Sequence, residues 1–402
     1  MEPKIRFKGF EDSWIGRKLT DVVSLYNGLT YTPNSIREKG TLVLRSSNVQ
    51  DGEITLNDNV YVESSVVNSP NVEKGDIIVV VRNGSRALIG KHAQIKNVMK
   101  DTVIGAFMAG MRSENPEFTN ALLGTPRFDY EVGINLGATI NQITNATFHS
   151  MSFGFPSNKE QKVIGKYFTS LDSQISASTS RLASLKQMKA ASLQAMFPEE
   201  GETVPKIRFK GFEGEWTWLK LGDISEQVKR KAPINSTAPV MMISALNGFI
   251  NQSEKYSDNN AGSSLANYTL LKKGELSYNH GYSKTRNFGS CFNLLVEEAR
   301  IPFVYHSFRL TNDNDSFYAY YLNSGTKDKD LKRLVSSTAR MDGLLNISFK
   351  NYMELSVPHP SLAEQQAIAN YFTSLDRQIS LQSQRLEKLK QIKSACLDKM
   401  FV

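Results

Sequence analysis

Polar side chains that could read DNA bases gather in a few short loops of this 402-residue chain. In the major groove, Arg makes paired hydrogen bonds with guanine and Asn or Gln with adenine, whereas Ser, Thr and Lys more often contact the backbone. The first half of the chain has three such groups, which are Arg45, Ser46, Ser47 and Asn48, then Arg82, Asn83, Ser85 and Arg86, then Asn141 and Gln142. We predict that these residues contact DNA.

The second half carries a denser loop, SYNHGYSKTRN, in which aromatic, basic and amide side chains surround a glycine. Its candidates for DNA contact are Asn279, His280, Tyr282, Ser283, Lys284, Arg286 and Asn287, with Arg340 farther along in STARMDG. Asn-Gly and Ser-Ser-Asn are also common turn sequences, so a turn or a solvated surface is the alternative interpretation of any single residue. For the loop SYNHGYSKTRN as a unit, the composition favours binding.

Catalytic patterns are missing from the sequence. An adenine methyltransferase would be expected to grip its flipped base with a segment that contains Pro-Pro, and this chain has no such dipeptide. GSRALIGKH resembles a phosphate loop, but Gly84 and Gly90 are one residue too far apart and His92 replaces the metal-binding hydroxyl. No Pro-Asp precedes the acid-x-Lys pattern of metal-dependent nucleases, and the histidines lack ligand spacing. We therefore predict no catalytic residue and no metal site.

Two blocks of sequence occur twice and define the elements that must position the loops. PKIRFKGFE stands at residues 3–11 and again at 205–213. A longer block runs from Pro156 to Phe197 and aligns without gaps on Pro360 to Phe401, with 24 of 42 positions identical. Each half of the chain therefore consists of the nine-residue repeat, which we call the box, then a variable middle segment, then the long block. This order predicts two structurally equivalent halves.

The long block has the features of a single helix. A proline opens each copy, a serine follows as N-cap, and Glu160 and Glu364 each stand three residues after that serine, which is the spacing of a capping box. No proline interrupts either copy. At 1.5 Å per residue, a helix of about 40 residues would be roughly 60 Å long.

Apolar residues on this helix recur at heptad positions a and d, which predicts a coiled-coil seam. The seam residues are Phe168, Leu171, Ile175, Leu182, Leu185 and Met196 in the first copy, and Phe372, Leu375, Ile379, Leu386, Leu389 and Met400 in the second. Lys189 and Lys393 interrupt an a position in matching places. We expect the two helices to pack on each other as an antiparallel pair, and packing on partner helices is the alternative.

The variable middles, residues 20–155 and 222–358, contain short β-branched runs broken by Gly and Asn turns. KGDIIVVVRNGS in the first resembles KGELSYNHGYS in the second, because both have a Lys-Gly-acidic start, an extended stretch and a polar loop. We expect one mixed α/β fold with two different surfaces.

The composition fits a soluble globular protein that binds a polyanion. Apolar residues make up 40% of the chain, charged residues 22%, and the formal net charge is +8. Neither a membrane-spanning apolar run nor a signal peptide is apparent, so we expect a cytoplasmic protein. The two cysteines predict neither a disulfide framework nor a thiolate metal site.

The order of these parts resembles the specificity (S) subunit of type I restriction-modification systems. Each variable segment is preceded by a G-F-x-x-x-W box and followed by a P-S-x-x-E-Q helix that runs through Y-F-T-S-L-D-x-Q-I-S, and the likeness covers essentially the whole chain. The resemblance implies an α+β fold, in which two globular mixed α/β target-recognition domains are separated by a long antiparallel two-helix coiled coil with pseudo-two-fold symmetry. The expected segments are 1–155, 156–198, 199–358 and 359–402, of which the second and fourth are the spacer helices.

The resemblance also implies a function without catalysis in this chain. Each globular domain would read one half of an asymmetric, bipartite site in double-stranded DNA. The helices would set the gap between the half-sites and dock two methyltransferase (M) subunits, and restriction (R) subunits would join through the complex. S-adenosylmethionine, ATP and Mg²⁺ are expected on those partner subunits. A self-contained methyltransferase or nuclease with unrecognised motifs, and a coiled-coil protein adaptor, are the alternatives.

Overall fold

The computed structural model of the chain describes residues 2–136, 141–233, 235–254, 265, 267–283, 285–335 and 345–402. The chain forms two compact units. Unit 1 comprises Met1–Ser180 with Gln384–Val402, and unit 2 comprises Arg181–Ser383. Each unit therefore combines most of one repeat with the far end of the other repeat's long helix.

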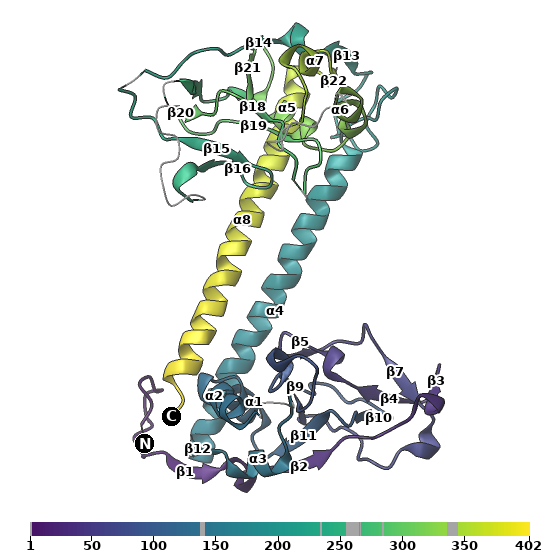
Figure 1. Cartoon of the computed structure of the whole chain (residues 1–402), viewed down its shortest axis with the longest axis vertical. Coiled ribbons are helices and arrows are strands. Elements are labelled where there is room, and N and C mark those ends of the chain that lie inside the picture. The colour runs from purple at the N-terminus through teal and green to yellow at the C-terminus, as the bar shows by residue number, and fades with distance from the viewer. Residues whose placement is uncertain are drawn as a thin grey trace. The chain divides into compact units, whose positions relative to one another are not determined.

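Unit 1 is built on an antiparallel sheet in which one of the two central strands is fully apolar. In spatial order its strands are β2 (Val23–Asn27), β11 (Met108–Ser113), β8 (Ile77–Val80) and β9 (His92–Gln94). All four residues of β8 are buried, so both faces of this strand are covered. The helices that follow are α1 (Pro116–Leu123), α2 (Pro126–Asn135) and α3 (Asn145–Ser150), and α1 lies against β9 (Figure 1).

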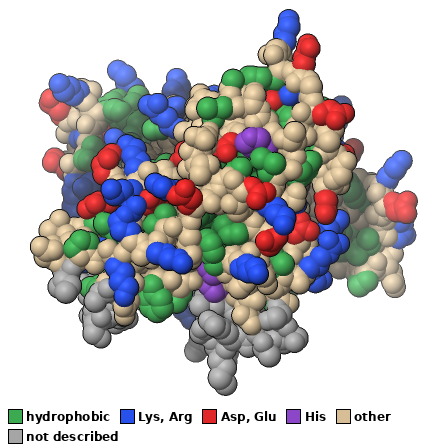
Figure 2. Space-filling view, turned by 90° about the horizontal axis from the view of Figure 1, so that it is seen from above, with side chains coloured by type: hydrophobic (Ala, Val, Ile, Leu, Met, Phe, Trp, Pro, Cys, Tyr) green, Lys and Arg blue, Asp and Glu red, His purple; other side chains and the backbone are tan. Residues whose placement is uncertain are grey.

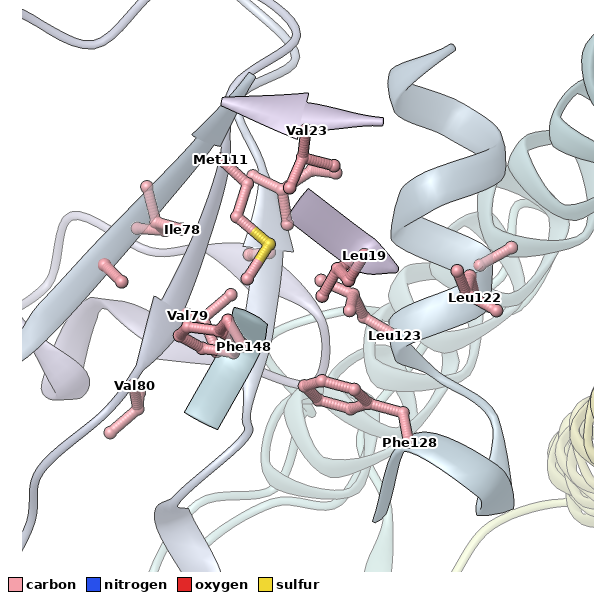
Figure 3. Close-up of a cluster of buried hydrophobic side chains, with 14 of the residues drawn as sticks. Leu19, Val23, Ile78, Val79, Val80, Met111, Leu122, Leu123, Phe128 and Phe148 are labelled. Carbon is pink, nitrogen blue, oxygen red and sulfur yellow. The ribbon is translucent and has the colours of Figure 1, made fainter. Parts of the chain in front are cut away.

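The core of unit 1 lies where this sheet meets the short helices. Figure 3 shows side chains from the strands and the helices in one cluster, among them Met111 of β11, Phe148 of α3 and Phe128 of α2. Met111, Phe128 and Phe148 have no solvent exposure. The loop that leaves β8 therefore starts from a rigid, fully packed strand.

A second, smaller sheet in unit 1 carries the first candidate loop. Its order is β10 (Thr102–Ile104), β4 (Thr41–Leu44), β7 (Val60–Val62) and β3 (Ile36–Arg37), with the short hairpin β5 (Val49–Gln50) and β6 (Glu53–Ile54) beside it in sequence. β10 and β4 are parallel, and the other pairs are antiparallel. Residues 45–48 follow β4 directly.

Unit 2 repeats the principal sheet of unit 1 with the same strand order. The strands are β14 (Ser225–Gln227), β21 (His306–Leu310), β18 (Leu276–Asn279) and β19 (Ser290–Asn293), followed by α5 (Asp315–Leu322), α6 (Asp328–Leu334) and α7 (Phe349–Met353). β8 and β18, which the Lys-Gly-acidic pattern paired in the sequence, hold equivalent places in the two sheets. The prediction of one fold for both middles is therefore confirmed.

The accessory strands differ between the units. Among its described residues, unit 2 has two strand pairs in place of a four-stranded second sheet, β15 (Met241–Ser244) with β16 (Gly248–Asn251), and β17 (Thr269–Lys272) with β20 (Glu298–Ile301). An isolated parallel bridge between Val240 and Arg300 joins them. Divergence is thus concentrated outside the principal sheet.

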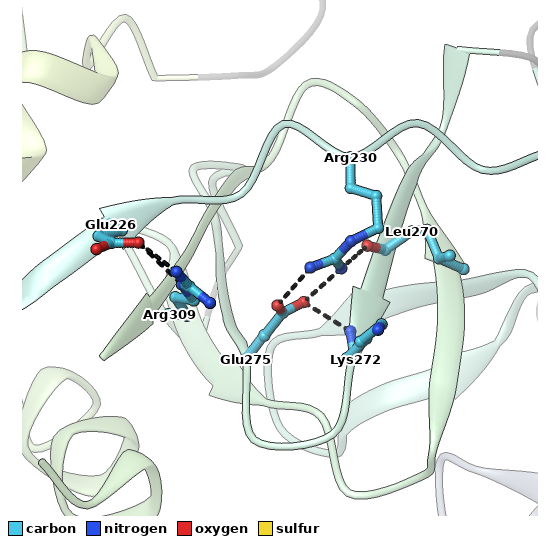
Figure 4. A network of polar contacts seen from close by, with 6 residues as sticks. All are labelled: Glu226, Arg230, Leu270, Lys272, Glu275 and Arg309. Carbon is cyan, nitrogen blue, oxygen red and sulfur yellow. Dashed lines mark hydrogen bonds and ion pairs between the residues drawn. The ribbon is translucent and has the colours of Figure 1, made fainter. Parts of the chain in front are cut away.

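An acidic residue fixes the turn before β8 in unit 1 and the turn before β18 in unit 2. The carboxylate of Glu275 accepts hydrogen bonds from Arg230 at 3.1 and 3.2 Å and from the backbone N–H of Lys272 at 2.7 Å (Figure 4). In unit 1, Asp76 accepts one from Arg112 Nε at 3.1 Å and one from the backbone N–H of Glu73 at 2.9 Å. The acidic residue that marks this pattern in the sequence therefore anchors the strand that leads to the candidate loop.

The repeated box is bound to the first turn of each long helix. Arg6 donates from Nε and Nη2 to Glu160 at 2.8 Å each, and Arg208 donates to Glu364 at 2.6 and 2.7 Å. The capping-box interpretation of these glutamates is corrected accordingly. The serine half of the box is present, since the N–H of Glu160 lies 3.4 Å from Ser157 Oγ, but the carboxylate binds arginine because a buried charge needs a counter-charge.

Two strand pairs join the box to the end of each variable middle. They are β1 (Ile15–Lys18) with β12 (Ser152–Phe155), and β13 (Thr217–Lys220) with β22 (Ser356–His359). Both pairs are antiparallel. Each unit is therefore closed by a strand that returns immediately before its long helix.

The long helices are α4 (Asn158–Ala195) and α8 (Leu362–Lys399), and they run antiparallel within each unit. In unit 1, Tyr167 Oη lies 3.4 Å from Cys396 Sγ, and Asp172 pairs with Lys393 at 2.6 Å. In unit 2, the Tyr371 and Ser192 hydroxyls are 2.9 Å apart, and Asp376 pairs with Lys189 at 2.5 Å. The two lysines that interrupt the heptads thus each find an aspartate on the facing helix.

The predicted seam residues are most buried near the globular parts of the units. Phe168, Leu171, Leu185, Met196, Phe372, Leu375 and Met400 are buried, whereas Ile175, Leu182, Ile379, Leu386 and Leu389 are half-buried. Several of the buried ones also pack on the domain cores. The ring of Phe168, for example, lies 5.7 Å from that of Phe401. No helix within the described residues is both long enough and apolar enough to span a membrane.

Candidate nucleic-acid interface

Three candidate groups that are far apart in the sequence of unit 1 meet on one surface. Asn83, in the loop after β8, donates from Nδ2 to Ser46 Oγ at 3.0 Å. Asn141 donates from Nδ2 to the carbonyl oxygen of Gly84 at 3.0 Å. Arg82 and Gln142 form an isolated antiparallel bridge. The loops after β4 and β8 and the segment before α3 therefore form one continuous polar surface.

Asn48 is a correction to the predicted set. Its side chain is fully buried, where Oδ1 accepts from the backbone N–H of Arg45 at 2.9 Å and Nδ2 donates to the carbonyl oxygen of Thr55 at 2.9 Å. The Asn48 amide closes the turn formed by Ser-Ser-Asn. Because it is buried and bonded to the backbone, it cannot hydrogen-bond to a base. Arg45 is half-buried, and its guanidinium pairs with Asp58 at 2.8 Å.

The most accessible candidates in unit 1 lie in the β8 to β9 loop. Arg82, Ser85 and Arg86 are exposed, while Asn83, Asn141 and Gln142 are half-buried, as are Ser46 and Ser47. Arg86 Nη2 donates to the carbonyl oxygen of Gly133 at 3.3 Å. The guanidinium carbon of Arg82 lies 5.0 Å from the centroid of the Phe107 ring.

The corresponding loop of unit 2 leaves β18 and is shaped by its own polar contacts. Ser283 and Arg286 exchange backbone hydrogen bonds of 3.1 and 3.2 Å, which close a tight turn. Tyr282 and Asn287 are exposed, and Arg286 is half-buried. Burial lowers the pKa of Arg286, and the charge of Asp328 opposes that shift. Lys284 and Arg340 lie outside the described residues.

His280 is a further correction, and Asn279 stays a prediction. His280 is buried, and its ring nitrogens lie 2.6 Å from the carbonyl oxygen of Leu345 and 2.9 Å from that of Val304. Asn279 donates from Nδ2 to the carbonyl oxygen of Ile243 at 3.2 Å. Both side chains hold neighbouring backbone segments together. His280 is buried and does not form the surface of the loop, whereas Asn279 is half-buried.

A second buried histidine lies beside His280. The two rings stack with centroids 4.9 Å apart, and His306 lies 2.8 Å through Nε2 from the carbonyl oxygen of Ile347. Burial lowers the pKa of His306, which favours its neutral form. This pair belongs to the interior of unit 2.

Two exposed phenylalanines near these loops were not predicted from the sequence. Phe107 is 52% exposed and Phe303 is 58% exposed. They lie in the turns before β11 and β21, which are closed by backbone hydrogen bonds from Met108 to Gly105 and from Tyr305 to Pro302. The only sequence signal for their exposure was a position shortly after a Gly or Pro in a tight turn. We did not predict it, because apolar residues are ordinarily assigned to a core.

Charge is mixed on one face of the molecule. Figure 2 shows Lys and Arg side chains interspersed with Asp and Glu on the face in view. Among the described residues, no group of His, Cys, Asp and Glu is arranged to hold a metal ion. The described loops present hydrogen-bond donors and aromatic rings that could contact DNA.

Comparison with known proteins identifies the family. The family model for the type I restriction modification DNA specificity domain matches residues 11–187 and again residues 213–391. The specificity subunit of type I restriction enzyme StySPI from Salmonella potsdam is 25% identical over 194 residues, which are 46% of this chain and 42% of that protein. The EcoKI specificity subunit from Escherichia coli K12 is 22% identical over 412 residues, which cover 94% of this chain and 87% of that protein.

A solved structure supports the same assignment at the level of the fold. The crystal structure of the type I restriction-modification S subunit from M. genitalium matches with a TM-score of 0.65 at 16% identity, covering 100% of this chain and 99% of that one. The two family matches together span most of the chain and fall one on each repeat. The chain therefore belongs to the family of type I restriction-modification DNA specificity domains, as a specificity subunit with two tandem copies of that domain.

Proposed function

We propose that this chain directs a type I restriction-modification enzyme to an asymmetric, bipartite DNA site and has no catalytic role of its own. The observation that carries the proposal is that one sheet topology presents two different loops. Seven residues after the glycine of the Lys-Gly-acidic start, the loop after β8 has Arg82 and the loop after β18 has Gly281. Two surfaces on one scaffold would read two different half-sites.

The proposed DNA contacts are the accessible members of the predicted set. In unit 1 these are Arg45, Ser46, Arg82, Asn83, Ser85, Arg86, Asn141 and Gln142, and in unit 2 they are Asn279, Tyr282, Ser283, Arg286 and Asn287. Ser47 is left out because its hydroxyl oxygen is buried. Lys284 and Arg340 remain candidates on the basis of their sequence. The convergence of three segments around Asn83 supports this assignment for unit 1, because a base-reading surface needs several donors within one groove.

We further propose two M subunits as partners, each docked on one copy of the repeated surface. Lys4, Ile5 and Lys8 are exposed in the first box, and their counterparts Lys206, Ile207 and Lys210 are exposed in the second. Two identical surfaces suit two identical partners. The long helices would set the gap between the half-sites, and R subunits would join through the M subunits. S-adenosylmethionine, ATP and Mg²⁺ are expected on those partner subunits.

The experiment that tests the proposal is to map methylated adenines in the genome of a cell that expresses this chain with its M subunit. The expected result is two different short half-sites separated by a constant number of unread base pairs. A palindromic target would contradict the assignment of different half-sites to the two units. Methyl transfer by the purified chain alone would support the alternative of a self-contained enzyme, and the absence of DNA binding by the complex would support the adaptor.

A further inference from the structure

We infer that Arg82 reads a guanine in the half-site bound by unit 1, and that Phe107 holds its guanidinium in the reading position. This inference rests on the proposed function, because it names one base contact within the proposed interface. It follows from the backbone contacts that hold the two residues together, from the unpaired N–H donors of Arg82 among the described residues, and from the exposed ring of Phe107.

The backbone of Arg82 is tied to the turn that carries Phe107. The backbone N–H groups of Val81 and Arg82 both point to the carbonyl oxygen of Phe107, at 2.9 and 3.2 Å. The turn itself is closed by the 2.8 Å bond from Met108 to Gly105. The ring and the guanidinium above it therefore start from backbone segments with a fixed separation.

The Arg82 guanidinium makes no hydrogen bond to the part of the chain that the structure describes. A cation–π contact places its guanidinium carbon 5.0 Å from the centroid of the Phe107 ring, and this contact does not supply a hydrogen-bond acceptor in the way a carboxylate would. Arg45 and Arg112 donate to carboxylates. Among the described residues, by contrast, the Arg82 side chain has no hydrogen-bond or ion-pair partner.

Guanine is the base that this guanidinium fits. Its O6 and N7 accept two parallel N–H bonds from one arginine in the major groove. The polar side chains beside Arg82 are Asn83 and Gln142, and Asn and Gln are residue types that read bases in the major groove. The exposed Phe107 would lose contact with water as DNA covers it, which adds to affinity.

Unit 2 cannot make the same contact. The equivalent position is Gly281, and the exposed aromatic residue of that loop is Tyr282, which is 63% exposed. The guanine read by Arg82 is therefore assigned to one half-site only.

The test uses the complex of the full chain with its M subunit and the target obtained by methylation mapping. Binding is measured to the native target and to a panel in which each base pair of both half-sites is replaced, and each guanine is replaced by 7-deazaguanine, which lacks N7. For R82A and R82K we expect an affinity for the native target about 10- to 100-fold lower, with loss of preference at one guanine position in one half-site. F107A should relax preference at that same position by a smaller factor.

Arg127 supplies a matched control. Its guanidinium also lies over an exposed ring of unit 1, Tyr130 at 5.6 Å, but it is paired with Glu131 at 2.5 Å. R127A should leave every base preference unchanged. If R82A instead weakened binding equally on all sequences, Arg82 would be a phosphate contact, and a changed preference in both half-sites would equally overturn the inference. A wild-type complex without any sequence preference would contradict the proposed function itself.

Discussion

At the scale of single residues, the repeated box is explained by one buried ion pair in each unit. Glu160 and Glu364 have side chains that are only 1% exposed, and each receives two hydrogen bonds from the arginine of its box. Glu364 also accepts one from Trp216 Nε1 at 3.0 Å. An arginine fork matches a carboxylate geometrically, which lysine cannot do. The box therefore fastens the chain to the start of the helix.

The substitution E364Q tests this role. It leaves the Arg208 charge without its partner in a largely buried site, so we expect the melting temperature of unit 2 to fall by about 5 °C. E354Q is the control, because the Lys220 to Glu354 pair has side chains 58% and 52% exposed and should contribute little. Thermal unfolding followed by circular dichroism measures both. Equal melting temperatures for the two variants would show that the box is held by its aromatic residues alone.

At the scale of elements, the first long helix approaches α1 more closely than a side chain allows. A Cβ added to Gly165 would lie 2.7 Å from the backbone nitrogen of Phe118 and 2.9 Å from Glu117 Cβ. The aligned residue of the second repeat is Ala369, which is buried and accommodated. The two repeats therefore pack their helices on their domains at slightly different separations.

Replacing this glycine should destabilise unit 1 although alanine favours helix. We expect G165A to lower the free energy of unfolding by about 1–2 kcal/mol, because backbone displacement outweighs a gain in helix propensity of about 1 kcal/mol. G133A in α2 is the matched control. Among the described residues, no atom would lie within 4 Å of the added Cβ, so this variant should gain about 0.5–1 kcal/mol. Urea unfolding measures both, and a stabilised G165A would contradict the close packing.

At the scale of the whole molecule, each unit completes its core with the end of the other repeat's helix. Phe401 lies 5.4 Å from Phe118 and 6.2 Å from Trp14 in unit 1. Phe197 lies 5.5 Å from Phe317 in unit 2. The Met-Phe that ends both long blocks is therefore a core element, and the constant segments of the two repeats depend on one another.

This division of labour predicts a modular target. Exchanging residues 20–155 for the same segment of another family member retains both boxes, both helices and Phe401. We therefore expect one half-site of the methylated sequence to change while the other half-site and the gap stay the same. Methylation mapping of the chimaera measures this. A change in both half-sites would show that the units do not read DNA independently.

The sequence by itself determined the repeat, the two long helices, the family and the shared sheet of the two middles. These follow from local patterns such as heptads, caps and the Lys-Gly-acidic start, in which neighbouring residues carry the signal. It also located the loops after β8 and β18, because polar residues cluster there in an otherwise apolar setting.

Only the tertiary structure decided which side chains are available in those loops. Asn48 and His280 have the residue types of base readers, but their partners are backbone groups brought near by the fold. The cation–π contact of Arg82 with Phe107 joins positions 25 residues apart, and the ion pair of Arg6 with Glu160 joins positions 154 residues apart. No local pattern encodes such pairs. Long-range packing therefore decides whether a polar side chain is hydrogen-bonded within the protein or remains available to DNA. Residue type alone does not reveal this.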